Sequence, residues 1–206
     1  MIKFFMNKIS GCLLFGLVIG LAGCAGHSPK TSFYKLVPLA ELGELDGAVP
    51  HYDFSVGVGP ITIPDYLKRP QIVTRESDSR LQIAEFHRWA GLLEKDIAAV
   101  MVDNLTDLLG SERVVTYPWD RLARPDYRVV YDIQRFDGTP GVEAVLKVRW
   151  TVFDTAAGKV EKVLGKRYRL PLDGPGYESL VKAESELLGQ FSRDVAAELL
   201  KKKLSD

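Results

Sequence analysis

Residues 126–136 read Asp-Tyr-Arg-Val-Val-Tyr-Asp-Ile-Gln-Arg-Phe, and residues 142–153 read Val-Glu-Ala-Val-Leu-Lys-Val-Arg-Trp-Thr-Val-Phe. Apolar side chains recur at every second position of both stretches, which is typical of strands with one buried face. The link at 137–141, Asp-Gly-Thr-Pro-Gly, is a run of turn-forming residues. A third strand is expected over residues 159–170. Because a parallel crossover needs a dozen or more residues, these short links predict an antiparallel meander.

Two amphipathic helices are predicted, over residues 89–109 and 177–204. In both, apolar residues fall three or four positions apart and form one wide stripe. Gly110 follows the first stripe, where a glycine commonly ends a helix. The stripe of the first helix is expected to begin at Trp89 and to include Leu92.

Shorter strands are expected over residues 32–38, 54–63, 70–75, 81–84 and 112–117. The pair 70–75 and 81–84 is expected to form a hairpin, and residues 39–52 a loop. Pro60 lacks a backbone N–H, so its strand should be an edge strand or contain a bulge. Together these elements predict one α+β domain over residues 32–206, a mostly antiparallel sheet with two amphipathic helices packed on it.

Composition excludes several classes of protein. Of 206 residues, 46% are hydrophobic, 27 are Lys or Arg, and 27 are Asp or Glu. This content of apolar residues is enough for a buried core and argues against intrinsic disorder. The formal net charge of zero provides no basic footprint for phosphate, so no nucleic-acid partner is expected.

The first 23 residues differ from the rest and predict a secretory signal peptide. Lys3 and Lys8 precede an apolar run over residues 9–22. Those 14 residues are too few to cross a bilayer as a helix, which takes about 20. A positive start, a short apolar run and small residues before a cleavage site are the usual signs of export.

Leu21-Ala22-Gly23-Cys24 resembles a bacterial lipobox. The resemblance implies cleavage between Gly23 and Cys24, with a diacylglycerol on the sulfur and an acyl chain on the new amine of Cys24. Residues 24–31 would then be a lipidated tether. Ala25, rather than Asp, favours the periplasmic face of the outer membrane by the sorting rule of enteric bacteria. The alternative is an ordinary signal peptide that happens to contain a cysteine.

The mature chain contains little that suggests catalysis. Cys12 leaves with the signal peptide and Cys24 carries lipid, so no free thiol, disulfide or cysteine metal ligand is expected. Phosphate-loop, serine-elbow and His-Glu-x-x-His motifs are absent from the sequence. Of the three histidines, only His87 lies near predicted structure, where it is expected to cap a helix or face solvent. No catalytic residue, metal or cofactor other than the covalent lipid is predicted.

Residues 64–70 read Pro-Asp-Tyr-Leu-Lys-Arg-Pro. The two prolines restrict the backbone and lower the entropy cost of holding a defined loop. Tyr and Arg are common anchors in binding interfaces. Pro64, Asp65, Tyr66, Leu67, Arg69 and Pro70 are therefore candidate partner-binding residues. The alternative is that Tyr66 simply packs on the core.

A family resemblance rests on this loop and on later segments. Residues 61–73 resemble the signature of the PqiC-type ABC-transport auxiliary lipoproteins. Arg88-Trp89-Ala90-x-x-Leu93, Asn104-Leu105, Tyr117-Pro118-Trp119 and Tyr127-Arg128-Val129 are similar too. The resemblance extends from about Phe33 to the final helix. Lys68 departs from the family pattern, which often has Asp or Glu there.

The resemblance implies a non-enzymatic lipoprotein of the cell envelope. Such proteins work with a periplasmic MCE-domain protein and an inner-membrane component to move lipids between membranes. The loop and Trp119 are the candidate contacts with that partner. Two alternatives remain open, an envelope lipoprotein hydrolase and a structural scaffold that self-associates into a homo-oligomer.

Overall fold

The computed structural model describes residues 29–45, 51–119 and 124–204. The chain divides into two units, Met1–Lys30 and Thr31–Asp206, and the fold reported below is that of the second. Gly23 and Cys24 lie outside the described residues, as does the whole signal peptide. Cleavage and lipidation therefore remain predictions from the sequence.

The described part of the second unit contains eight strands, three α-helices and one 3-10 turn. In chain order they are β1 Ser32–Tyr34, α2 Leu39–Leu42, β2 Val56–Thr62, η2 Asp65–Leu67, β3 Gln71–Ser77, β4 Arg80–Trp89, α3 Leu93–Leu109, β5 Val114–Thr116, β6 Tyr127–Thr139, β7 Glu143–Asp154, β8 Lys159–Pro171 and α4 Tyr177–Lys203.

Strand β6 is the centre of the sheet. One edge pairs antiparallel with β7 along its full length, and β7 pairs antiparallel with β8. The other edge of β6 pairs parallel with β2 near its start and with β3 near its end. The predicted meander is thus confirmed, as is the α+β class.

The short strands add parallel pairs that the sequence patterns do not predict. β1 runs parallel to β4, and β5 runs parallel to β2. Strand β2 lies between β5 and β6, so it is not an edge strand. Its register shifts between Val58 and Ile61, around Pro60. Of the two predicted options for Pro60, the bulge is therefore the correct one.

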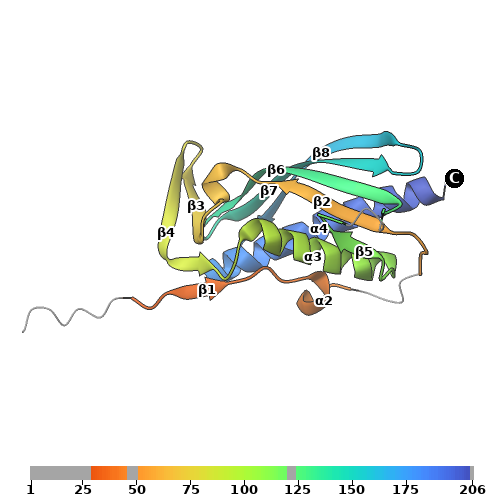
Figure 1. The fold of residues 1–206 in the computed structure, drawn as a ribbon. Coiled ribbons are helices and arrows are strands. Elements are labelled where there is room, and N and C mark those ends of the chain that lie inside the picture. Colours follow the sequence, from red (N-terminus) through yellow and green to blue (C-terminus); the bar gives the residue numbers. More distant parts are fainter. Residues whose placement is uncertain (1–28, 46–50, 120–123, 205–206) are drawn as a thin grey trace, which may run out of the picture. The chain divides into compact units, whose positions relative to one another are not determined.

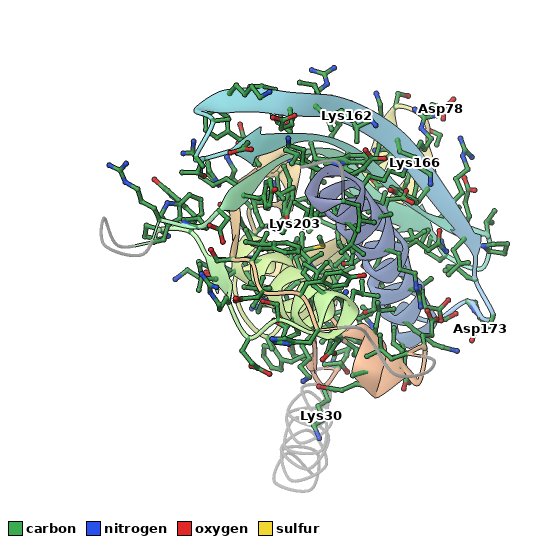
Figure 2. All side chains as sticks on the ribbon, turned by 90° about the vertical axis from the view of Figure 1, so that its right-hand side faces the viewer. Lys30, Asp78, Lys162, Lys166, Asp173 and Lys203 are labelled. Carbon is green, nitrogen blue, oxygen red and sulfur yellow. The ribbon has the colours of Figure 1, made fainter. Side chains whose placement is uncertain are left out.

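Helices α3 and α4 cover one face of the sheet (Figure 1). An end view shows them side by side inside its curve (Figure 2). The alternating residues of β6 and β7 point toward them, and Phe191 of α4 packs edge-on against Tyr131 and Trp150, with ring centroids 5.3 and 5.2 Å apart. The core is therefore the layer between the meander and the two helices.

Helix α3 begins at Leu93, four residues later than predicted. Trp89 is instead the last residue of β4, and its backbone N–H donates to the carbonyl oxygen of Pro70 at 2.7 Å. Leu92 is 65% exposed at the helix start. The predicted helix start at Trp89 was wrong because Trp89, a buried residue at the end of a strand, falls by chance on the helical spacing of the apolar residues that follow. Gly110 ends the helix as predicted, with φ of 55°.

The predicted loop at 39–52 contains a short helix, α2. Its first residue, Leu39, is fully buried and packs closely on Gly189 of α4. The Leu39 N–H donates to Asn104 Oδ1 at 2.7 Å, and Asn104 Nδ2 donates to Ser192 Oγ at 3.0 Å. One buried amide on α3 thus joins α2 to both long helices.

Candidate docking surface

The predicted loop leaves β2 after Thr62 and enters β3 at Gln71. Its middle forms the turn η2, closed by the Leu67 N–H donating to the Pro64 carbonyl at 3.0 Å. Leu67 is 3% exposed and belongs to the hydrophobic core. Leu67 therefore holds the loop on the domain and is not available to a partner.

The side chain of Tyr66 is held by a hydrogen bond to Asp137, which lies near the end of β6. Its hydroxyl donates to Asp137 Oδ2 at 2.9 Å. Arg75 Nη2 donates to Oδ2 at 2.8 Å, and Arg135 Nε donates to Oδ1 at 2.7 Å. Asp137 is fully buried, so three donors from three elements converge on one carboxylate. Of the two predicted roles for Tyr66, the structure supports packing on the domain.

Protonation states in this cluster follow from burial and charge. Burial, with the nearby carboxylate of Asp137, raises the pKa of Tyr66 to about 12. Burial opposes ionisation of Asp137, but hydrogen bonds from Arg75 and Arg135 outweigh it and lower its pKa. At neutral pH Tyr66 is therefore a protonated donor to an ionised Asp137.

What the loop presents to solvent is mainly charge. Asp65 and Lys68 are exposed and form an ion pair at 2.8 Å. Pro70 is exposed as well, and Arg69 is half-buried with its Nε lacking a hydrogen-bond partner among the described residues. Lys68 also feels the charge of Glu94 in the first turn of α3. The accessible part of the loop is thus Asp65, Lys68, Arg69 and Pro70.

A mostly apolar groove of about 490 Å³ adjoins the loop. It lies between β2, the start of α3 and the chain after β5, and its lining includes Pro60, Ile61, Ala98, Ala99 and Tyr117. Sequence reasoning missed it, because three separate elements form its walls. The pair Ala98-Ala99, small residues on a helix of larger ones, is the signal in the sequence. We call the loop and this groove together the docking surface.

Trp119 lies at the other end of β2. Its ring packs with Pro125 over Gly57, where an added Cβ would come within 2.9 Å of Trp119 Cζ3. The loop begins after Thr62, roughly 20 Å further along the strand at ~3.3 Å per residue. The structure therefore does not bring Trp119 together with the other candidate residues.

His87 has a structural environment rather than the helix-capping one expected. It lies in β4, stacks on Tyr177 with ring centroids 3.9 Å apart, and shares a 2.8 Å hydrogen bond with the hydroxyl of Tyr34. Among the described residues, His, Cys, Asp and Glu side chains form no group of three suited to a metal ion. Within the same ranges, each helix is too short or too polar to span a bilayer.

Comparison with known proteins places these features in context. Residues 34–196 match the family model described as the ABC-type transport auxiliary lipoprotein component. Two curated relatives named intermembrane transport lipoprotein PqiC, from Escherichia coli (strain K12) and Shigella flexneri, are each 23% identical over 181 residues, which cover 87% of this chain and 91% of the relative.

The fold is also similar to that of solved structures. A crystal structure of an uncharacterized protein has a TM-score of 0.68 at 22% identity and covers 83% of this chain and 99% of its own. A protein from Xanthomonas campestris has a TM-score of 0.69 at 16% identity, with coverage of 85% and 98%. At these identities the two structures support the fold alone.

Proposed function

Since this chain belongs to the family of ABC-type transport auxiliary lipoproteins, we propose that it is the outer-membrane-anchored component of an intermembrane lipid transport system. The family model confirms the resemblance read from residues 61–73, and its description is that of a transport lipoprotein component. The finer parts of the proposal are the anchor, the partner and the surface that joins them.

The anchor is a triacylated Cys24 on the periplasmic face of the outer membrane. The lipobox at 21–24 and Ala25 support it, and more than one acyl chain is needed for stable attachment. Mass spectrometry of the mature N-terminus should find lipid on Cys24, and sucrose-gradient fractionation should find the protein with outer membranes. A mature chain that starts at Ala25 or later without lipid would exclude this anchor.

The partner is a periplasmic MCE-domain protein of the same system, linked to an inner-membrane component. One observation carries the proposed contact: the buried cluster around Asp137 holds the loop in one conformation before any partner arrives. A surface ordered in advance loses less conformational entropy on binding. The loop then offers Asp65, Lys68 and Arg69 beside an apolar groove, a charged rim next to an apolar centre.

Co-purification from solubilised membranes tests this contact. Asp65→Lys with Arg69→Glu reverses two charges of the loop without touching Tyr66 or Leu67, and Ala98→Glu places a charge in the groove. Both variants should lose most of the MCE-domain protein. The matched control is Lys201→Glu with Lys203→Glu, two exposed lysines at the end of α4, which should recover it normally. Equal recovery by all three folded variants would remove the docking surface from consideration.

A further inference from the structure

A second concave site lies on the face of the sheet that points away from α3 and α4, which we call the outer face. It is a cavity of about 420 Å³ at the start of β6 and the end of β7, lined by Trp119, Arg124, Pro125, Arg128, Phe153 and Thr155. This volume suits a small molecule or one part of a larger ligand. We call it the arginine pocket; none of its residues lines the groove of the docking surface.

The arginine pocket combines apolar walls with a cation that is held in place. Arg128 on β6 and Phe153 on β7 are directly opposite in the antiparallel ladder. The Arg128 guanidinium lies over the Phe153 ring, 4.1 Å from its centroid. Such a cation–π contact fixes the guanidinium without neutralising its charge. Trp119 and Pro125 form the facing wall, packed on the backbone of Gly57.

Two polar atoms of the pocket residues are buried without a partner among the described residues. They are Arg128 Nε and Thr155 Oγ1. Buried polar atoms in folded proteins almost always have hydrogen-bond partners. Two such atoms without a partner in residues that line one cavity therefore indicate that a hydrogen-bonding ligand occupies it. An N–H donor on a guanidinium and a hydroxyl together suit the oxygens of a phosphate or carboxylate group.

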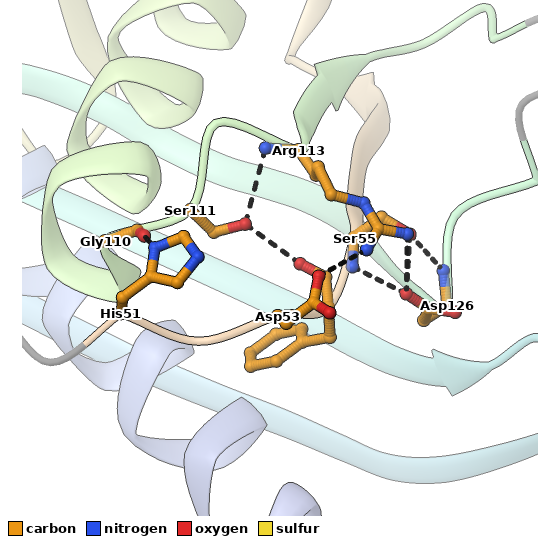
Figure 3. A network of polar contacts seen from close by, with 8 residues as sticks. His51, Asp53, Ser55, Gly110, Ser111, Arg113 and Asp126 are labelled. Carbon is orange, nitrogen blue, oxygen red and sulfur yellow. Dashed lines mark hydrogen bonds and ion pairs between the residues drawn. The ribbon is translucent and has the colours of Figure 1, made fainter.

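The backbone around the pocket is fixed by hydrogen bonds. Asp126, next to Pro125, accepts from the backbone N–H and the hydroxyl of Ser55 at 2.6 and 2.7 Å, and Arg113 lies nearby at 3.8 Å (Figure 3). The Thr155 N–H donates to the carbonyl oxygen of Asp126 at 2.9 Å. The donors of the pocket therefore stand on elements that are already ordered.

The surrounding charge favours an anion. Among the described residues, neither Arg124 nor Arg128 forms an ion pair. Lys147 and Arg149 alternate along β7 on the same face as Phe153, and Arg167 lies opposite Lys147. Asp132 lies opposite Arg149, and both cations of β7 stand four or more residues from Phe153, so the positive charge at the pocket itself comes from Arg124 and Arg128.

We propose that the arginine pocket binds the phosphate headgroup of a single phospholipid, with the glycerol region against Trp119 and Phe153. The anion site follows from geometry and charge alone, whereas the choice of a lipid over free phosphate rests on the proposed transport function. The cavity accommodates the headgroup and glycerol and leaves the acyl chains outside. The domain would then contact the cargo of the system itself.

Calorimetric titration of the full-length lipoprotein in an amphipathic polymer tests this assignment. The probes are dihexanoylphosphatidylglycerol, dihexanoylglycerol without phosphate, and inorganic phosphate. The phospholipid should bind saturably, at least tenfold more tightly than either of the others. If inorganic phosphate bound as tightly as the phospholipid, the pocket would be a general anion site, and the assignment to a lipid headgroup would be wrong. No saturable lipid binding would overturn the pocket altogether.

Single substitutions distinguish specific binding in the arginine pocket from nonspecific attraction of the lipid by charges on the outer face. Arg128→Gln should weaken lipid binding at least tenfold, whereas Arg149→Gln, the loss of one exposed charge on the same face outside the pocket, should change it less than twofold. Equal effects of the two would contradict the assignment. Thr155→Val removes the hydroxyl and should weaken lipid binding severalfold. It is the substitute test of the pocket if Arg128→Gln fails to fold. Recovery of the MCE-domain protein by Arg128→Gln should remain normal, so failure of docking and failure of lipid binding are distinguishable.

Discussion

The carboxyl group of Glu184 is buried on α4, and its Oε2 has no hydrogen-bond partner among the described residues. Burial, reinforced by the charge of Asp137, raises the pKa of Glu184 well above its usual range. Below the solution pKa of 4.5, a raised carboxyl pKa does not reduce the free energy of unfolding, because the group is protonated in both the folded and the unfolded state. Above it the folded state must hold a proton that the unfolded state releases, so stability falls as pH rises.

Glu184→Gln should therefore stabilise the protein at pH 8 and have little effect at pH 4. The difference in free energy of unfolding should widen by up to about 1.4 kcal/mol per pH unit above the solution pKa. Urea denaturation at a series of pH values measures it. A constant difference between the two proteins across this range would show that Glu184 is ionised in the folded state.

Tyr66→Phe tests whether Tyr66 positions the docking loop. The variant keeps the ring and loses the hydrogen bond to Asp137, which Arg75 and Arg135 still neutralise. We expect a loss of about 1–2 kcal/mol in the free energy of unfolding and faster hydrogen exchange of the Leu67 and Lys68 amides. Tyr52→Phe is the control, since Tyr52 lies beside the far end of α3, where its backbone N–H donates to the carbonyl oxygen of Leu109. Unchanged exchange in Tyr66→Phe would mean that other contacts order the loop.

The sequence could identify this loop but not the roles within it. Two prolines around Asp-Tyr-Leu predicted a rigid segment, and the structure has one. Tyr66 forms a hydrogen bond with Asp137, 71 residues away in the sequence. No local sequence pattern predicts a contact over that separation. Trp119 packs edge-on against Tyr117 of the groove, with ring centroids 5.2 Å apart, and lines a separate cavity with Arg128 and Phe153. No local pattern in the sequence predicts these contacts, and the role of Trp119 as a partner contact stays a prediction.

At the scale of elements, Gly138 marks the place where α4 crosses β6 and β7. An added Cβ would lie 2.5 Å from Leu180 Cδ1 and 2.6 Å from the carbonyl oxygen of Glu143. Because the second contact is backbone, Gly138→Ala should destabilise the protein by about 1–3 kcal/mol. Gly165→Ala on β8, where the nearest atom is 3.8 Å away, should be nearly neutral. Similar thermal shifts for both variants would contradict the close crossing.

Periodicity predicted the long elements well and the short ones poorly. The meander and α4 follow a regular alternation or stripe over a dozen residues or more, so their ends are accurate to a few positions. Strands β1 and β5 have three residues each, and their parallel partners are set by tertiary crossovers rather than by local pattern. The start of α3 was misjudged for the related reason that a buried strand end imitates a helical stripe.

For the whole molecule, the titrating groups act in two opposite directions. Burial opposes ionisation of Asp126, Asp137 and Asp194, but hydrogen bonds to each carboxylate outweigh it and lower the pKa. The hydrogen bond from Lys162 lowers the pKa of Glu198. A lowered carboxyl pKa contributes stability above the solution pKa and loses it as pH falls through the folded value. Glu184, whose pKa is raised most, contributes the opposite slope, and the pKa values of Asp96, Asp103 and Glu186, raised by burial, act in the same direction.

The free energy of unfolding should therefore pass through a maximum at about pH 5 and decline on both sides. Below about pH 4 the unfolded chain takes up protons that the paired carboxylates of the folded state do not, so the stability they contribute is lost. Above about pH 5 the penalty at Glu184 grows. Urea midpoints from pH 3 to pH 8 measure the profile. Glu184→Gln should flatten only the alkaline side, whereas Asp126→Asn, which loses the ionised acceptor of Ser55, should flatten only the acid side. A profile without a maximum, or a variant that alters the opposite side, would show that the buried carboxylates do not set the pH dependence of this fold.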